Sequence, residues 1–279
     1  MDVQVPSALG DGRHADADTP APDGGTTRES RDYIADSAHL IVRGRNADVY
    51  LMNDTQVLRR LHTGALTYPN IDLLRHLNSL GYPTARIIEA DGTDLILERL
   101  HGPNLLQALD TGEVSMSQGV RILLDLHSSL HALPLPPIPT VRLDSPPGTA
   151  GTIARVPAPT APRSGTSMLH LDLHPGNVLL TADGPRVIDW ESARLGSAGV
   201  DLATTALVFA EVVVDGNEYA RAAQRMLRHF TREADENFRP YLTDAASVRS
   251  AFTNIDPAER ELLPDATLVV DEELRRIGR

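Results

Sequence analysis

One stretch constrains this chain more than any other, because it fixes the spacing of several polar side chains around a predicted hairpin. The loop at residues 170–177 reads HLDLHPGN and runs directly into the apolar strand 178–180. An Asp-Gly turn follows, and the return strand ends in Val187-Ile188-Asp189. Because the two strands of a hairpin lie side by side, residues at its open end meet. We therefore expect Asn177 and Asp189 to be neighbours, next to the loop that carries Asp172.

These residue types suit phosphoryl transfer. A loop aspartate can accept the proton of a substrate hydroxyl, and an asparagine with a second aspartate can hold Mg²⁺ against ATP phosphates. The reaction needs little beyond such positioning and the neutralisation of charge. Asp and Asn also favour ordinary turns, but an additional aspartate at the end of the return strand favours the catalytic interpretation.

Two histidine patterns allow a metal site instead. His170, Asp172 and His174 alternate along an extended stretch, so all three could ligate the metal of a metallohydrolase. The sequence has no second His-rich motif to complete that site. His127 and His131 have the i, i+4 spacing of zinc ligands, but no glutamate follows His127, and we expect them to pack on a helix face.

The motif H-x-D-x-H-P-x-N followed by I-D-W-E is similar to that of the aminoglycoside phosphotransferase and choline-kinase-like family of small-molecule kinases, and the resemblance extends from about residue 37 onward. It implies that Asp172 is the catalytic base, with His170 bracing the loop backbone. It further implies that Asn177 is a metal ligand and Asp189 the main one. Asp201 would be a buried acid bonded to the catalytic loop. Glu191 is either a solvent-facing acid or a contact to metal or substrate.

The same resemblance implies a nucleotide site in the N-terminal part. Gly44 would belong to the loop that covers the phosphates, or be a simple hairpin glycine. Arg59 takes the place of the phosphate-pairing lysine, and Asp72 the place of its helix glutamate. The chain contains no lysine at all, and an arginine fork sits differently from an ammonium group. The hinge that meets the adenine would comprise Glu98, Arg99 and Leu100.

Hydrophobic patterning predicts strands and one helix in the N-terminal part and mainly helices after them, and the resemblance implies that these form a two-lobed, protein-kinase-like α+β fold. The N-lobe (37–101) should be a small antiparallel sheet of strands 39–44, 48–52, 56–60, 86–90 and 94–100, with one helix that Asn70 caps and Gly81 ends. The C-lobe (102–279) should be mainly helical, with helices beginning at Asn104 and near Ser117. Residues 1–36 read as a disordered leader, and residues 133–166, with nine of the twenty prolines, as a Pro-rich loop.

Composition narrows the possible functions. The formal net charge is −12 and no basic run is present, which argues against nucleic-acid partners. The absence of cysteine excludes disulfides, thiolate catalysis and Cys-based zinc sites. Because the sequence starts without an apolar signal segment and Glu211 interrupts the apolar run 206–214, we expect a cytoplasmic protein without a membrane partner.

The leading hypothesis is an O-phosphotransferase that uses ATP, or GTP, with Mg²⁺ to phosphorylate a small hydroxylated molecule, either an aminoglycoside-like antibiotic or a metabolite alcohol. A nucleotide-binding pseudokinase with a regulatory role is the alternative, because Arg59 and Asp72 depart from the family pattern. The metallohydrolase is the third hypothesis.

Overall fold

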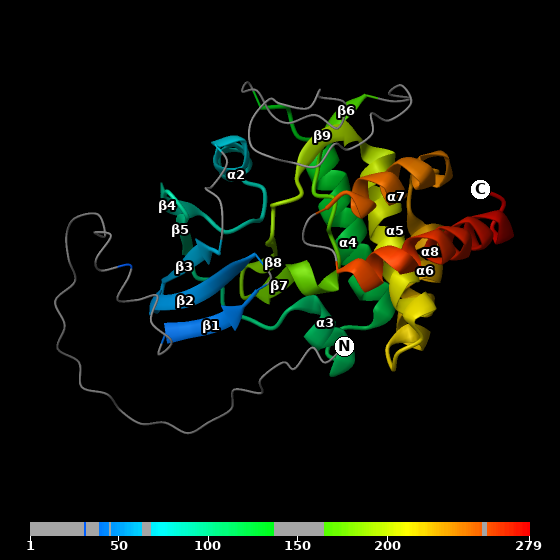
Figure 1. Cartoon of the computed structure of the whole chain (residues 1–279), viewed down its shortest axis with the longest axis horizontal. Coiled ribbons are helices and arrows are strands. Elements are labelled where there is room, and N and C mark those ends of the chain that lie inside the picture. Colours follow the sequence, from blue (N-terminus) through cyan, green and yellow to red (C-terminus); the bar gives the residue numbers. More distant parts are fainter. Residues whose placement is uncertain (1–30, 32–38, 45, 63–67, 137–164, 253–255) are drawn as a thin grey trace.

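The computed structural model describes residues 31, 39–44, 46–62, 68–136, 165–252 and 256–279. Within them the chain forms two lobes, a sheet with one helix and a larger helical part, which the segment between β5 and α3 connects (Figure 1). The predicted α+β, kinase-like architecture is confirmed. The predicted leader, Arg31 excepted, and residues 137–164 of the Pro-rich loop lie outside the described residues.

The N-lobe is a five-stranded antiparallel sheet in the order β1-β2-β3-β5-β4. Its strands are β1 (Leu40–Arg43), β2 (Ala47–Asn53), β3 (Gln56–Leu61), β4 (Ile87–Asp91) and β5 (Asp94–Glu98), and its helix is α2 (Tyr68–Ser79). The predicted order of elements is correct. The predicted helix cap at Asn70 is wrong, since α2 already begins at Tyr68; proline is tolerated in the first turn, so Pro69 does not delay the helix.

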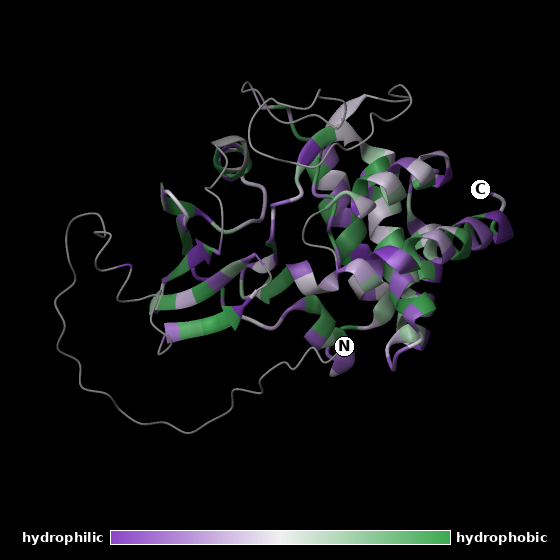
Figure 2. Ribbon diagram, in the orientation of Figure 1, coloured by the Kyte–Doolittle hydropathy of each residue, from purple (hydrophilic) through white to green (hydrophobic). Residues whose placement is uncertain are grey.

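The strand β1 forms one edge of this sheet and carries apolar side chains outward. Ile41 is 44% exposed and Val42 is 53% exposed. Figure 2 shows this strand as hydrophobic along most of its length. The sheet therefore buries its central strands, where Leu58 and Ile96 are almost fully covered, and leaves the edge open.

The C-lobe is built around one largely buried helix. That helix, α5 (Ala198–Asp215), packs against α6 (Ala220–Glu233), α7 (Leu242–Ser250) and α8 (Pro257–Arg276). The lobe also contains α3 (Leu105–Asp110), α4 (Met116–His131) and the short 3-10 turns η2 (Pro175–Asn177) and η3 (Arg239–Tyr241). In the described part of the chain no helix combines the length and the apolarity that crossing a membrane requires.

Capping residues set the starts of the first two C-lobe helices. Asn104 caps α3, as predicted, through a reciprocal capping box with Gln107. Ser115 caps α4 in the same way with Gln118, so this helix begins close to the predicted position.

Two antiparallel strand pairs frame the predicted catalytic loop. The hairpin of β7 (Val178–Thr181) and β8 (Gly184–Val187) confirms the sequence prediction. The other pair, β6 (Thr166–Leu169) and β9 (Arg194–Ser197), was not predicted. Each of its strands has four residues, too few to show an alternating pattern, and the two pair across the whole loop and hairpin. β6 leads into the loop, and β9 leads into α5.

The close approach of α5 to η3 gives a stability prediction. A Cβ at Gly199, in the first turn of α5, would lie 2.2 Å from Cδ2 of the buried Tyr241. Gly199→Ala should therefore lower the free energy of unfolding by about 1–3 kcal/mol, the usual range for overpacking. The control is Gly165→Ala, where no atom lies within 4 Å. Urea unfolding measures both, and equal stabilities would contradict the packing described.

Candidate active site

The predicted catalytic loop is held by hydrogen bonds to the side chain of Asp201 on α5. This carboxylate is fully buried and accepts hydrogen bonds from the backbone nitrogens of His170 (3.1 Å) and Leu171 (2.6 Å) and from His131 Nε2 (2.9 Å). Leu171 has a φ of 64°, a left-handed conformation that is rare for leucine. Asp201 thus fixes a sharp bend, as the buried acid that the sequence predicted.

The pKa of Asp201 reflects these contacts. Burial alone would raise this pKa, but His127 and His131 hold it well below its usual value. The carboxylate is therefore charged at neutral pH and keeps its bonds to the loop.

A second residue of α5 holds the same loop one helical turn further on. The Thr205 hydroxyl donates to the backbone oxygen of Leu173 (2.7 Å) and accepts from His127 Nε2 (2.9 Å). His127, His131 and Asp201 bring their ligand atoms within 4.8 Å of one another, close enough for a metal. The Asp201 oxygens, however, already accept backbone amides, so this cluster braces the loop, in line with the packing role expected for the histidines.

His170 ties the loop to the end of the β7–β8 hairpin. Its Nδ1 accepts from the Asp172 backbone nitrogen (3.2 Å), and its Nε2 donates to the Ile188 oxygen (3.0 Å). Burial lowers the pKa of His170, which keeps the ring neutral. The ring also packs against Trp190 at 4.6 Å between centroids. Since both ring nitrogens are bonded to the backbone, His170 has no lone pair for a metal, and the ligand set of the metallohydrolase hypothesis does not form.

The hairpin brings Asn177 beside Asp189, as predicted. The Ile188 nitrogen donates to the Asn177 backbone oxygen (3.0 Å). The Asn177 side-chain nitrogen donates to the Asp172 backbone oxygen (2.9 Å) and lies 3.3 Å from Asp172 Oδ2. The side-chain oxygen of Asn177 therefore points away from Asp172. Asp189 has a φ of 64°, a backbone strain typical of functional sites.

The electrostatics of Asp189 suit a cation. Loss of hydration, and then the neighbouring Glu191 carboxylate, raise the pKa of Asp189 to about 6, while Arg59 opposes this shift. Carboxylate and amide oxygens are the donors that Mg²⁺ prefers. Asn177 and Asp189 therefore fit a magnesium ion, which would also relieve the repulsion between the two acids.

Arg59 on β3 reaches across to the C-lobe. Its Nη2 bonds to the Glu191 carboxylate and lies 3.9 Å from Asp189 Oδ1. Asn46, next to the Gly44 turn, donates to the other Glu191 oxygen (2.9 Å). The expected partner Asp72 instead lies 3.5 Å from Arg75 on its own helix. The Arg59–Asp72 pairing is therefore wrong, because the long arginine finds a nearer acid on the segment after the hairpin.

The two other predicted nucleotide contacts lie on the N-lobe backbone. Gly44 donates to the Ala47 oxygen (3.0 Å) in a turn so tight that a Cβ would lie 2.4 Å from that oxygen. In the hinge, the Glu98 and Arg99 nitrogens donate to the oxygens of Arg86 and Thr55. Of the three hinge amides, the one at Leu100 has no such partner among the described residues and suits a base.

The sequence analysis did not assign Arg249 or Glu211 to the site. Arg249 on α7 donates from Nη1 to Asp172 Oδ1 (3.1 Å). Its Nε and Nη2 donate to the two oxygens of Glu211 on α5, at 2.5 and 2.8 Å. Glu211 did give a signal, because a charge within an apolar helix needs a partner. Nothing near Arg249 in the sequence marks it as that partner.

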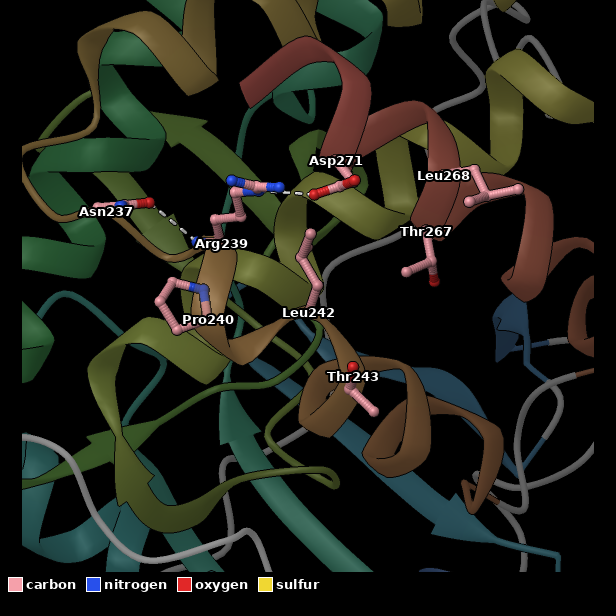
Figure 3. A pocket seen from close by; sticks show the side chains of 8 residues that line it. All are labelled: Asn237, Arg239, Pro240, Leu242, Thr243, Thr267, Leu268 and Asp271. Atoms are coloured by element: carbon pink, nitrogen blue, oxygen red, sulfur yellow. Dashed lines mark hydrogen bonds and ion pairs between the residues drawn. The ribbon is translucent and has the colours of Figure 1, made fainter. Parts of the chain in front are cut away.

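A separate cavity of about 420 Å³ opens between the η3–α7 segment and α8 (Figure 3). Arg239 donates to Asp271 there, at 2.6 Å. None of the predicted site residues lines this cavity.

The proposed roles of the site residues in binding and turnover stay predictions.

Solved structures of two kinase groups share this fold. A thermostable mutant of aminoglycoside phosphotransferase APH(4)-Ia is 16% identical, with a TM-score of 0.57 over 86% of this chain and 94% of that one. Choline kinase from Cryptosporidium parvum Iowa II is 10% identical, with a TM-score of 0.54 over 85% and 88%. Choline kinase LicA from Streptococcus pneumoniae is 12% identical, with a TM-score of 0.52 over 87% and 97%.

The sequence itself matches over a shorter range. No curated protein matches the chain. Residues 140–249 match the model of the phosphotransferase enzyme family, and this range contains the loop, the hairpin and Asp201. The resemblance carried by the loop motif is thereby confirmed: the segment 140–249 matches the phosphotransferase enzyme family, and the fold is that of the aminoglycoside phosphotransferases and choline kinases.

Proposed function

We propose that this protein is an ATP- and Mg²⁺-dependent O-phosphotransferase that acts on a small hydroxylated molecule. The observation that carries the proposal is the convergence of Asp172, Asn177 and Asp189 at the open end of one hairpin, with Arg59 bonded beside them. The neighbour described as a ternary complex with AMP-PNP and hygromycin B supports both the nucleotide and the hydroxylated acceptor.

The residues have separate tasks in this reaction. Asp172 accepts the proton of the acceptor hydroxyl while the hydroxyl oxygen forms a bond to the γ-phosphorus. The bond from that phosphorus to the β–γ bridging oxygen breaks, and ADP leaves with the electron pair. Arg59 attracts the phosphates, and Asn177 and Asp189 would hold Mg²⁺. The ion supplies charge neutralisation when bound.

A regulatory, nucleotide-binding protein without turnover is the second candidate. It is favoured by the contact of Arg59 with Glu191, because this guanidinium is already bonded to a carboxylate. ATP turnover with Mg²⁺ in the presence of a library of hydroxylated compounds distinguishes the two, since only the phosphotransferase releases ADP in proportion to a phosphorylated acceptor.

Nucleotide binding should be visible as thermal stabilisation. A ligand present at about 100 times its Kd stabilises a protein by roughly 2.7 kcal/mol. We expect millimolar ATP with Mg²⁺ to raise the melting temperature measurably, and EDTA to reduce the shift. An unchanged melting temperature under these conditions would contradict both the phosphotransferase and the nucleotide-binding alternative.

Substitutions of the two aspartates should fail in different ways. Asp172→Asn removes the proton acceptor but keeps an oxygen for Arg249, so nucleotide binding should persist while turnover falls by about 10²–10⁴. Asp189→Asn removes a charge that faces the cation, so Mg²⁺-nucleotide binding should weaken. Melting shifts measure binding, and ADP release measures turnover. Full activity of Asp172→Asn would refute the assignment of the base.

Two adjacent arginines on β3 provide a matched pair of variants. Their side chains leave opposite faces of the strand. Arg59→Ala should weaken ATP binding about tenfold or more, because a charge-assisted bond to phosphate is lost. Arg60 bonds bidentately to the buried Asp94, at 2.7 Å each, so Arg60→Ala should lower stability with little effect on ATP affinity. Greater loss of affinity in Arg60→Ala would contradict the strand register.

A further inference from the structure

A buried arginine connects the proposed base to the core of the C-lobe. The side chain of Arg249 is only 8% exposed, and that of Glu211 only 6%. The edge of the guanidinium that carries Nε and Nη2 lies against both Glu211 oxygens, at 2.5 and 2.8 Å. Since a guanidinium is planar, this bidentate contact also fixes the direction of Nη1. Nη1 donates to Asp172 Oδ1 at 3.1 Å.

The contacts of Asp172 show what this direction achieves. Its Oδ1 accepts from Arg249, and its Oδ2 lies 3.3 Å from the Asn177 side-chain nitrogen and 3.9 Å from His174 Nε2. The two carboxylate oxygens are thus held from opposite sides, one by the loop itself and one by α7. With only the loop contacts, the carboxylate could rotate about its side-chain bonds.

The pair of Glu211 and Arg249 is poorly explained as a stabilising element of the core. Burial raises the pKa of Glu211, and the bonds to Arg249 oppose that shift. Buried ion pairs often contribute no more to stability than apolar side chains of the same volume, because both charges lose their hydration. The arrangement is explained if the guanidinium acts on Asp172.

We propose that Arg249 is a positioning residue for the phosphoryl transfer: anchored by Glu211, it holds the Asp172 carboxylate in the orientation that receives the acceptor proton. This inference rests on the proposed function. Arg249 touches neither substrate nor nucleotide in this role and acts only through Asp172. The planar arrangement of the guanidinium N–H donors matters more than the charge, because a single ammonium group cannot hold the Glu211 and Asp172 carboxylates in fixed orientations.

The test replaces the buried pair as a unit. The double variant Glu211→Met/Arg249→Met removes both charges together and roughly keeps the volume, so neither member of the pair stays buried without the other. We expect its kcat to fall by about 10²-fold, the usual effect of misplacing a reacting group by about 1 Å. The KM for ATP and the melting shift with ATP and Mg²⁺ should stay within about twofold. Arg249→Lys, which retains the charge, should also lose kcat and provides a second folded variant.

A control ion pair lies in the cavity between the η3–α7 segment and α8. Arg239 and Asp271 bond at 2.6 Å between η3 and α8 (Figure 3), and neither residue bonds to Asp172, Glu211 or Arg249. The variant Arg239→Met/Asp271→Met should keep the parental kcat. If both swaps lower kcat equally, the effect reflects general damage to the helical lobe, and the inference is overturned.

A double-mutant cycle separates positioning from a purely structural role. If Arg249 acts through Asp172, the Glu211/Arg249 swap should cause no further loss of the residual rate in Asp172→Asn. Loss by the same factor in both backgrounds would overturn the inference, as would full kcat of the swap in an active parent. A parent that phosphorylates no acceptor would instead overturn the proposed function, and this inference with it.

Discussion

The site depends first on the carboxylate of Asp201. It accepts hydrogen bonds from two backbone amides of the loop and from one histidine, so a single buried charge joins α4, α5 and the predicted catalytic loop. Thr205, one turn later on α5, holds the loop at Leu173. Because α5 is also the centre of the C-lobe packing, the loop is fixed to a helix that is itself largely buried. The left-handed backbone at Leu171 persists because these contacts outweigh its cost.

Two arginines add further connections from this loop region to other parts of the chain. Arg59 links the sheet to Glu191 and Asp189, and Arg249 links α5 and α7 to Asp172. Each guanidinium contacts two carboxylates at once, which its planar array of donors permits and a lysine ammonium does not in fixed geometry. The chain contains no lysine, and Arg59, the residue predicted to replace the family lysine, bonds to an acid of the other lobe.

The parts of the site that the sequence predicted are those with local causes. The β7–β8 hairpin follows from a short turn between apolar strands, and it alone suffices to place Asn177 beside Asp189. The β6–β9 pair depends on contacts across the entire loop and hairpin, so no short window contains its signal. The partner of Arg59 likewise could not be found from local sequence. Asp72 seemed the natural partner of Arg59 because both belong to the N-lobe, whereas Glu191 becomes the nearer acid only once the lobes are assembled.

Charge balance explains why nucleotide and cation suit this site together. Asp189 and Glu191 are close, and Arg59 offsets only part of their charge, so the pKa of Asp189 is raised to about 6. A cation alone would satisfy the two acids but leave Arg59 bonded to Glu191. A nucleotide alone would bring its phosphates to Arg59 and also to uncompensated carboxylates. In the proposed function, a bound cation would neutralise the two acids, and Arg59 would then be able to pair with the phosphates. The unbalanced charges around Asp189 and Glu191 are therefore consistent with the metal–nucleotide site that we propose.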